Sequence, residues 1–264
     1  MLPGFPVAAP RGAAVTADHE TAVLSGTVTG ASVTETLVAS CADLGAGMAA
    51  HPWVRSLADG TLPEKALIAW AQQDRLFIIE ELRAFLVLRS VAPPGELDDL
   101  LAMLISEGQR EPGRLAETLA ELGAAVTDQA WPTCLGYGSY LRVCALGGLL
   151  EGLTALYAAE RFYLDTWAAV LPSSPAGSRW RSWVENWSGD EFRAVVTGLG
   201  TCLDKLAGPP TAPVLARLQP IYRNVALYGL AFWEMCWAGQ GWPEPQVRPL
   251  PRCVPDSQDG PRVM

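Results

Sequence analysis

The chain has 264 residues, of which 50% are hydrophobic and 18% are charged, a composition typical of a folded protein with a sizeable core. Its net charge is −9 and its pI about 4.8; an acidic surface repels phosphate backbones, so we expect no nucleic-acid partner. The longest apolar runs are too short to cross a bilayer, and the N-terminus lacks a signal-peptide pattern. We therefore expect no membrane partner and a cytoplasmic location.

Three regions differ in composition along the chain. Residues 1–30 are rich in small residues and proline without periodicity, which predicts a flexible leader. Residues 31–240 carry helical patterns almost throughout, and we find no paired runs of alternating β-branched residues. Residues 241–264 are proline-rich and cannot continue a helix. The sequence predicts one all-α domain, a helical bundle, between a leader and a tail.

In chain order, the first half of this domain predicts three helices. Residues 33–49 form the first, which ends at a break before Pro52. Residues 62–91 form a long second helix, with apolar side chains at i, i+3 and i+4 spacing and Thr61 as the expected N-cap. Residues 95–123 form the third, which we expect to bend around Pro112.

The second half predicts further helices. Residues 133–171 form two helices that are either joined around Gly147-Gly148 or continuous through it. Residues 180–207 contain a restart, for which Ser188 is the expected N-cap. Residues 213–237 form the last helix.

Asp74, in "WAQQDRLF", is the first candidate functional residue. It shares a helix face with Trp70 and Ile78, so its carboxyl group points along an apolar stripe. Such a group either finds a partner, for example Arg75, or has a raised pKa.

Tyr137, in "TCLGYGSYL", is the second candidate. The glycines on either side, Gly136 and Gly138, are costly in a helix unless another element packs close to the backbone there. Tyr137 shares a helix face with Tyr140, and such an aromatic stripe fits either a helix-bundle core or a ligand pocket.

Glu160, in "ALYAAERFYLDTWAAVLP", is the third candidate. Tyr157 and Tyr163 share its helix face, which favours a buried or cleft-facing carboxyl group, whereas Arg161 and Asp165 can occupy the outer face. The ten tryptophans gather in later segments, which would suit a flat heterocyclic ligand or a bundle core.

Metal and disulfide chemistry have little support in the sequence. The two histidines, His19 and His51, do not follow a glutamate at Glu-x-x-His spacing. The cysteines show no C-x-x-C or metal-ligand spacing, so we expect buried thiols in a reducing compartment; they are Cys41, Cys134, Cys144, Cys202, Cys236 and Cys253. No nucleotide-binding or hydrolase-elbow motif occurs, and we expect no cofactor and no metal.

The order of these motifs resembles the TenA family of thiamin-salvage proteins, which has the haem-oxygenase-like all-α fold. The resemblance covers roughly residues 45–240 and rests on "GTLP" before a helix with "QQD", "PTCLGY", "WVENWSGDEF" and "FWEM". It implies that Asp74 grips an aminopyrimidine ring and that Tyr137 orients the ring or holds water. We expect four aromatic side chains to contact the substrate: Phe77, Tyr163, Trp187 and Trp233.

Glu160 occupies the place of the catalytic cysteine of the better-known branch. In this respect the chain resembles the TenA_E branch, where a glutamate stands at that position. Two departures stand out: Trp187 replaces a tyrosine, and Gly229 replaces a glutamate. Glu234, five residues later, projects about 140° away around the helix and is not an automatic substitute.

The resemblance implies hydrolysis of a C–N bond on a thiamin-derived pyrimidine, the removal of an amino or formylamino group, with Glu160 as the acid/base. It also implies a homodimer or a larger homo-oligomer. Two alternatives stay open. One is a pyrimidine-binding or pathway-specific protein without salvage activity. The other is an oxidase on the haem-oxygenase-like scaffold, either cofactorless or with a dimetal site. Haem oxygenase itself needs an axial histidine, for which His51 would be the candidate.

Overall fold

The computed structural model describes residues 30–178 and 180–242, and these residues form helices and connecting loops without a β-strand. The predicted all-α fold is confirmed. The predicted leader and tail lie outside the described residues, except for Gly30, Gly241 and Trp242. The domain bounds at 31 and 240 therefore stay a prediction. Within the described part of the chain, none of the helices combines the length and the hydropathy that a bilayer-spanning segment needs.

The helices of the described residues follow one another with short connections. They are α1 (Val33–Ser40), α2 (Ala42–Ala50), α3 (Pro52–Asp59), α4 (Glu64–Val91), α5 (Glu96–Gly108), α6 (Glu111–Glu121), α7 (Pro132–Gly147), α8 (Leu149–Val170), the 3-10 turn η1 (Leu171–Ser173), α9 (Arg181–Ser188), α10 (Asp190–Ala207) and α11 (Ala212–Ala238).

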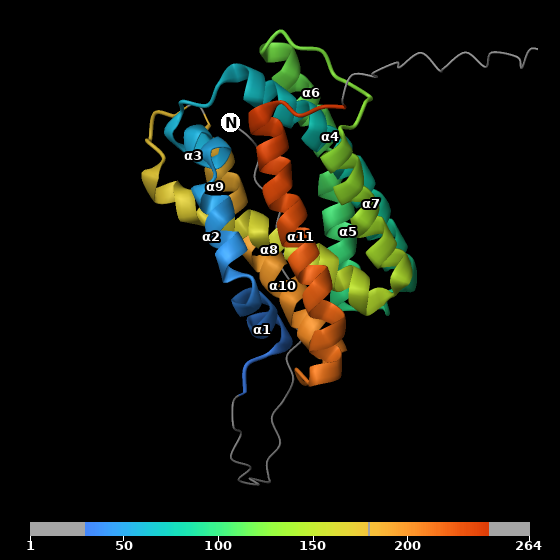
Figure 1. The fold of residues 1–264 in the computed structure, drawn as a ribbon. Coiled ribbons are helices and arrows are strands. Elements are labelled where there is room, and N and C mark those ends of the chain that lie inside the picture. The colour runs from blue at the N-terminus through green and yellow to red at the C-terminus, as the bar shows by residue number, and fades with distance from the viewer. Residues whose placement is uncertain (1–29, 179, 243–264) are drawn as a thin grey trace, which may run out of the picture.

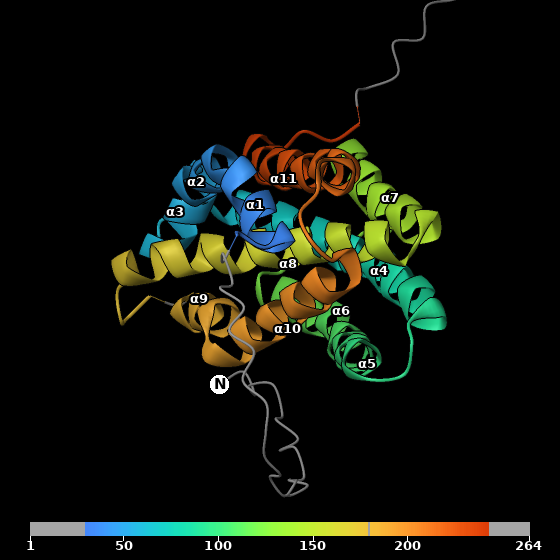
Figure 2. The same cartoon turned by 90° about the horizontal axis from the view of Figure 1, so that it is seen from below.

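Helix α8 lies at the centre of the bundle (Figures 1 and 2). It contacts α7, α11 and α2 on one side and α9 and α10 on the other. Figure 2 shows it crossing the middle of the molecule between these two groups. Most of its side chains are buried, including Leu153, Leu156 and Trp167. These neighbours cover its apolar faces, whereas Arg161 and Asp165 of the same helix reach the surface.

Helices α4 and α7 pack against each other unusually closely. A Cβ atom added to Gly138 of α7 would lie 2.6 Å from the Cβ atom of Glu80 on α4. A side chain at position 138 would therefore push the helices apart. The close approach predicted from the glycines beside Tyr137 is confirmed.

Several predicted helix ends differ from the structure. The first predicted helix is two helices, because Cys41 has φ −129° and ψ 23° and interrupts the hydrogen-bonding pattern between α1 and α2. Thr61 does not cap α4: its hydroxyl donates to the Asp59 carboxylate over 2.6 Å. Ser188 does not cap α10 either, because its hydroxyl donates to the Val184 carbonyl over 2.6 Å and closes α9.

The two breaks in the middle of the chain have clear backbone causes. The predicted bend near Pro112 is a complete break: α5 ends at Gly108, and Pro112 lies in the first turn of α6, where a missing N–H costs no hydrogen bond. Helices α7 and α8 are separate because Gly148 has φ +149°, a conformation that side chains rarely adopt.

Candidate active site

A cavity of about 370 Å³ lies inside the bundle, within the range of about 300–1,000 Å³ that small-molecule sites occupy. Its walls come from α2 and from every α-helix from α4 to α11. All seven predicted site residues line it: Asp74, Phe77, Tyr137, Glu160, Tyr163, Trp187 and Trp233. Residues from five separate helices therefore converge on one space, which is a necessary condition for the roles predicted for them.

Gln73, which precedes Asp74 on α4, fixes this part of the helix through hydrogen bonds. The buried Gln73 side chain accepts a hydrogen bond from the backbone N–H of Trp131 over 2.7 Å and donates one to the backbone carbonyl of Gln129 over 3.2 Å. These bonds tie α4 to the segment that leads into α7. The "QQD" motif thus fixes the part of α4 from which Asp74 faces the cavity.

The Asp74 carboxyl group has no ion pair or side-chain hydrogen bond among residues 30–178 and 180–242. The pairing with Arg75 that the sequence left open is wrong, because Arg75 turns away and lies 3.6 Å from Asp128. Burial, followed by the charge of Glu111, raises the pKa of Asp74 from 3.8 to about 8. Asp74 therefore keeps its proton at neutral pH.

Glu160 points from α8 into the same cavity. Its neighbour Arg161 faces outward and donates to Asp165 over 2.7 Å, as the helical spacing predicts. Burial raises the pKa of Glu160 from 4.5 to about 7. A carboxyl group with this pKa exchanges a proton readily near neutral pH, which suits general acid–base catalysis.

Tyr137 completes the predicted catalytic group. Its ring lies 4.5 Å from that of Phe77 and 5.4 Å from that of Tyr228, measured between ring centroids, with the two tyrosine rings almost parallel. Burial, and then the charges of Glu81 and Glu160, raise the pKa of Tyr137, so the phenol stays protonated and able to donate a hydrogen bond.

Aromatic rings form much of the cavity lining. The ring centroids of Tyr163 and Trp233 lie 6.1 Å apart at an interplanar angle of 13°, and Trp187 meets Tyr163 edge to face at 5.4 Å. Trp70 also lines the cavity, and its indole N–H is buried without a partner in the described part of the chain. Parallel rings and an available N–H donor would suit a flat heterocycle with polar edges.

Sequence reasoning missed Glu81, a third carboxyl group in the cavity. It follows Asp74 by seven residues, which is two turns of α4, so both face the same side. Burial, followed by the charges of Glu160 and Asp74, raises the pKa of Glu81 well above its ordinary value. The i, i+7 spacing from Asp74 was the signal that could have identified it.

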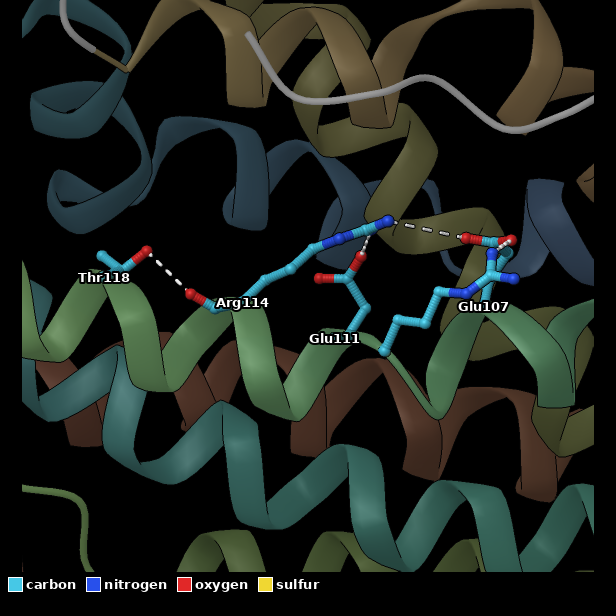
Figure 3. Close-up of polar contacts among 5 residues, drawn as sticks. Glu107, Glu111, Arg114 and Thr118 are labelled. Carbon is cyan, nitrogen blue, oxygen red and sulfur yellow. Dashed lines mark hydrogen bonds and ion pairs between the residues drawn. The ribbon is translucent and has the colours of Figure 1, made fainter.

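Sequence reasoning also missed the charged edge of the cavity on α5 and α6 (Figure 3). The Arg114 side chain extends along α6, forms an ion pair with Glu111 and lies 3.8 Å from Glu107. The exposed Glu117 and Glu121 line the same edge. Arg114 is the single cation among the described lining residues, and these two carboxylates already occupy it.

The last helix contributes no carboxyl group to the cavity. Gly229 lines it, and a Cβ atom there would lie 3.2 Å from the Met48 Cε atom, so a long side chain would not fit without movement. Glu234 instead lies 3.1 Å from the His51 Nε2 atom. The other ring nitrogen of His51 accepts a hydrogen bond from the Trp53 N–H, so a haem-ligand role would require these contacts to break.

Metal-ligating side chains do not gather in the described part of the chain: no group of three or more His, Cys, Asp or Glu has suitable geometry. The five cysteines within the described ranges are buried free thiols. One of them, Cys134, donates to the Gln73 carbonyl over 3.2 Å, and burial raises its pKa to about 12. It is therefore a packing residue and not a thiolate nucleophile.

The sequence is similar to those of known proteins over most of its length. The model of the TENA/THI-4/PQQC family matches residues 38–239. An uncharacterised Haemophilus influenzae protein is 26% identical over 70% of this chain and 89% of its own length. The aminopyrimidine aminohydrolase of Bacillus subtilis is 24% identical over 81% of this chain and 93% of its own. Among solved structures, a TenA homologue from Pyrococcus furiosus superposes with a TM-score of 0.71 at 25% identity, covering 78% of this chain and all of its own.

Proposed function

The chain belongs to the TENA/THI-4/PQQC family, and on this basis we propose that its cavity hydrolyses a C–N bond of a thiamin-derived aminopyrimidine. The substrate is an aminomethyl- or formylaminomethyl-pyrimidine, as in the TenA_E branch. The relative named aminopyrimidine aminohydrolase supports the reaction class. The observation that carries the proposal is the convergence of Asp74, Tyr137 and Glu160 on one aromatic-walled cavity.

Asp74 binds the ring in this proposal. Its carboxyl group accepts hydrogen bonds from a 4-amino group and from a protonated ring nitrogen, an edge that matches two carboxylate oxygens. The raised pKa of Asp74 supports this role, because the proton that the carboxyl group keeps at neutral pH is available to the ring nitrogen. Binding would then create an ion pair inside the protein without leaving an unpaired charge there.

Glu160 acts on the reacting bond. With a pKa of about 7 it can take a proton from water or give one to the leaving nitrogen. Tyr137 donates a hydrogen bond that orients the ring or the water molecule. Phe77, Tyr163, Trp187 and Trp233 enclose the ring and keep bulk water away.

A pyrimidine-binding protein without turnover is the second candidate. The observation that favours it is Gly229, where Met48 occupies the space into which a side chain would extend. Calorimetry separates the candidates: tight binding of the pyrimidine without product formation would favour the binding protein.

Purified full-length protein tests the proposal. It is incubated with aminomethyl- and formylaminomethyl-pyrimidine while ammonia, formate and hydroxymethyl-pyrimidine are measured. We expect release of ammonia from the first substrate and of formate from the second. Intact substrate in both reactions would contradict the proposal.

We also propose a homodimer or a larger homo-oligomer in the cytoplasm. Three exposed apolar residues of α7, Leu135, Val143 and Leu146, support self-association, and the free thiols support a reducing compartment. Light scattering after gel filtration tests the first statement, and a monomer at all concentrations would contradict it. Fluorescence microscopy of the tagged protein in its native cell tests the second, and signal outside the cytoplasm would contradict it.

A further inference from the structure

Glu81 is a partly buried carboxyl group that the proposed reaction does not yet use. It lines the cavity from α4 and has no ion pair or side-chain hydrogen bond within residues 30–178 and 180–242. Its neighbour Glu80 differs completely: the Glu80 carboxylate lies 2.7 Å from an Arg142 nitrogen and also pairs with Arg83. The same turn of helix thus carries one carboxyl group with cationic partners and one without.

An unpaired buried carboxyl group lowers stability unless it stays protonated. Nothing in the packing around Glu81 requires an acid there, because its contacts to the protein involve no cation. Cavity-lining acids without structural partners are characteristic of catalytic sites. Glu81 therefore requires a functional explanation, and Glu160, which lines the same cavity, suggests one.

We propose that Glu81 is a second catalytic carboxyl group, which forms an acid–base pair with Glu160 at the scissile C–N bond of the substrate. This inference rests on the proposed hydrolase function. The groups that face Glu81 from the surrounding helices are Asp74 on its own helix, Tyr137 on α7 and Glu160 on α8. Asp74 is engaged with the ring and Tyr137 is a weak acid, so Glu160 is the partner available for proton exchange.

Both candidate reactions need two proton transfers. Water forms a C–O bond to the methylene or formyl carbon and loses a proton to one carboxylate. The C–N bond breaks, its electron pair stays on nitrogen, and the other carboxyl group gives that nitrogen a proton. The products are the alcohol and ammonia, or formate and the amine. Proton exchange between the two carboxyl groups then restores the starting state, so no further reactant is needed.

The surroundings of the two groups assign their roles. Like charges in one cavity cannot both form easily, so a close pair of carboxyl groups holds one proton in common. Burial and the charges of Glu160 and Asp74 raise the pKa of Glu81 well above its ordinary value, whereas that of Glu160 rises to about 7. Glu81 holds the proton and acts as the acid towards the leaving nitrogen, and Glu160 is the base.

The test compares Glu81→Gln, Glu160→Gln, the double variant and Glu80→Gln as the matched control, all in the full-length protein. We expect Glu81→Gln to lower kcat about 10²–10⁴-fold, the usual effect of a general acid, while the calorimetric Kd of hydroxymethyl-pyrimidine changes less than about threefold. The double variant should be no slower than the slower single variant, because the two residues act as a unit. The kcat of Glu80→Gln should stay within about twofold of wild type, because Glu80 lies outside the cavity lining and its carboxylate pairs with Arg83 and Arg142.

Infrared spectroscopy supplies a readout that does not depend on turnover. At neutral pH the wild type and Glu80→Gln should show the band of a protonated carboxyl group, and Glu81→Gln should lose part of it. An unchanged band in Glu81→Gln overturns the acid role. Wild-type activity that survives in Glu81→Gln but is lost in Glu160→Gln overturns the inference alone. An inactive wild type overturns the proposed function and, with it, the catalytic role of Glu81.

Discussion

Gly138 of α7 lies against Glu80 of α4 so closely that a Cβ atom at position 138 would be 2.6 Å from the Glu80 Cβ atom. This contact sets the spacing of the two helices from which Tyr137 and Asp74 face the cavity. Glycine is required there by packing and not by backbone conformation, since its φ is not positive. The geometry of the cavity thus depends on the absence of one methyl group.

Gly138→Ala should destabilise the protein by about 1–3 kcal/mol, because overpacking forces the helices apart. The control is Gly147→Ala on the same helix, where a Cβ atom has nothing within 4 Å. That change should be neutral or stabilise the fold by up to about 1 kcal/mol. Urea unfolding measures both. Equal stability of the two variants would contradict the role given to the close contact.

Asp74→Asn should weaken pyrimidine binding about 10–100-fold, since a hydrogen bond to a charged group contributes about 1.5–3 kcal/mol. Isothermal titration calorimetry with hydroxymethyl-pyrimidine measures the Kd. Asp128→Asn is the control, because the Asp128 side chain is 96% exposed and is not part of the cavity lining. Unchanged affinity in Asp74→Asn would remove Asp74 from the ring-binding role.

The fold and the main site residues follow from the sequence because their signals are local. Asp74 and Glu160 stand out as single carboxyl groups on apolar helical stripes, and helical spacing fixes which face they occupy. Glu81 was missed because "IIEELR" contains two adjacent glutamates. Helical spacing places Glu81 on the side of Asp74, but only the packing of α7 shows that Glu80 has a cationic partner, Arg142.

The charged edge of the cavity and several helix ends were not predictable for a different reason. Arg114 and Glu111 face the cavity because α6 packs along α4 after the break at Gly108, and a single-sequence pattern does not give the direction of the chain after such a break. The hydroxyls of Thr61 and Ser188 have nearby alternative acceptors, Asp59 and the Val184 carbonyl, which compete with capping.

Stability should fall as the pH rises through the range of the cavity carboxyl groups. Asp74 and Glu160 have folded-state pKa values of about 8 and about 7, above their ordinary 3.8 and 4.5. The folded state therefore binds more protons than the unfolded state between these limits, so the free energy of unfolding decreases with rising pH. Urea unfolding of the wild type at pH 5 and pH 8 measures the decrease.

The variant Glu160→Gln tests whether Glu160 contributes to the pH dependence of stability. The neutral amide keeps the shape of the protonated acid, so the variant should equal the wild type near pH 4 and exceed its stability at pH 8. Parallel stability–pH curves for the two proteins would show that Glu160 does not titrate with a raised pKa.

The cavity should discriminate against anionic substrates. Seven carboxyl groups line it, Asp74, Glu81, Glu107, Glu111, Glu117, Glu121 and Glu160, against the single described cation Arg114. A pyrimidine with a phosphate group should therefore bind at least about tenfold more weakly than its alcohol, a difference of about 1.4 kcal/mol. Competition assays at low salt measure the ratio of the inhibition constants.

The exposed edge residues provide the control for this discrimination. The double variant Glu117→Gln/Glu121→Gln should lower the ratio of the two inhibition constants, because it removes two negative charges from the edge of the cavity. Salt at about 0.5 M should lower the same ratio, because exposed charges are screened. A phosphate ester that binds as tightly as the alcohol would contradict the electrostatic account.

The central claim is that Glu160 performs proton transfer on a pyrimidine held by Asp74. Its most direct test is the rate of product formation from aminomethyl- and formylaminomethyl-pyrimidine by wild type and Glu160→Gln at saturating substrate. The account predicts a fall in kcat of about 10²–10⁴-fold for the variant, with little change in the Kd of hydroxymethyl-pyrimidine. Equal rates for the two proteins would contradict it.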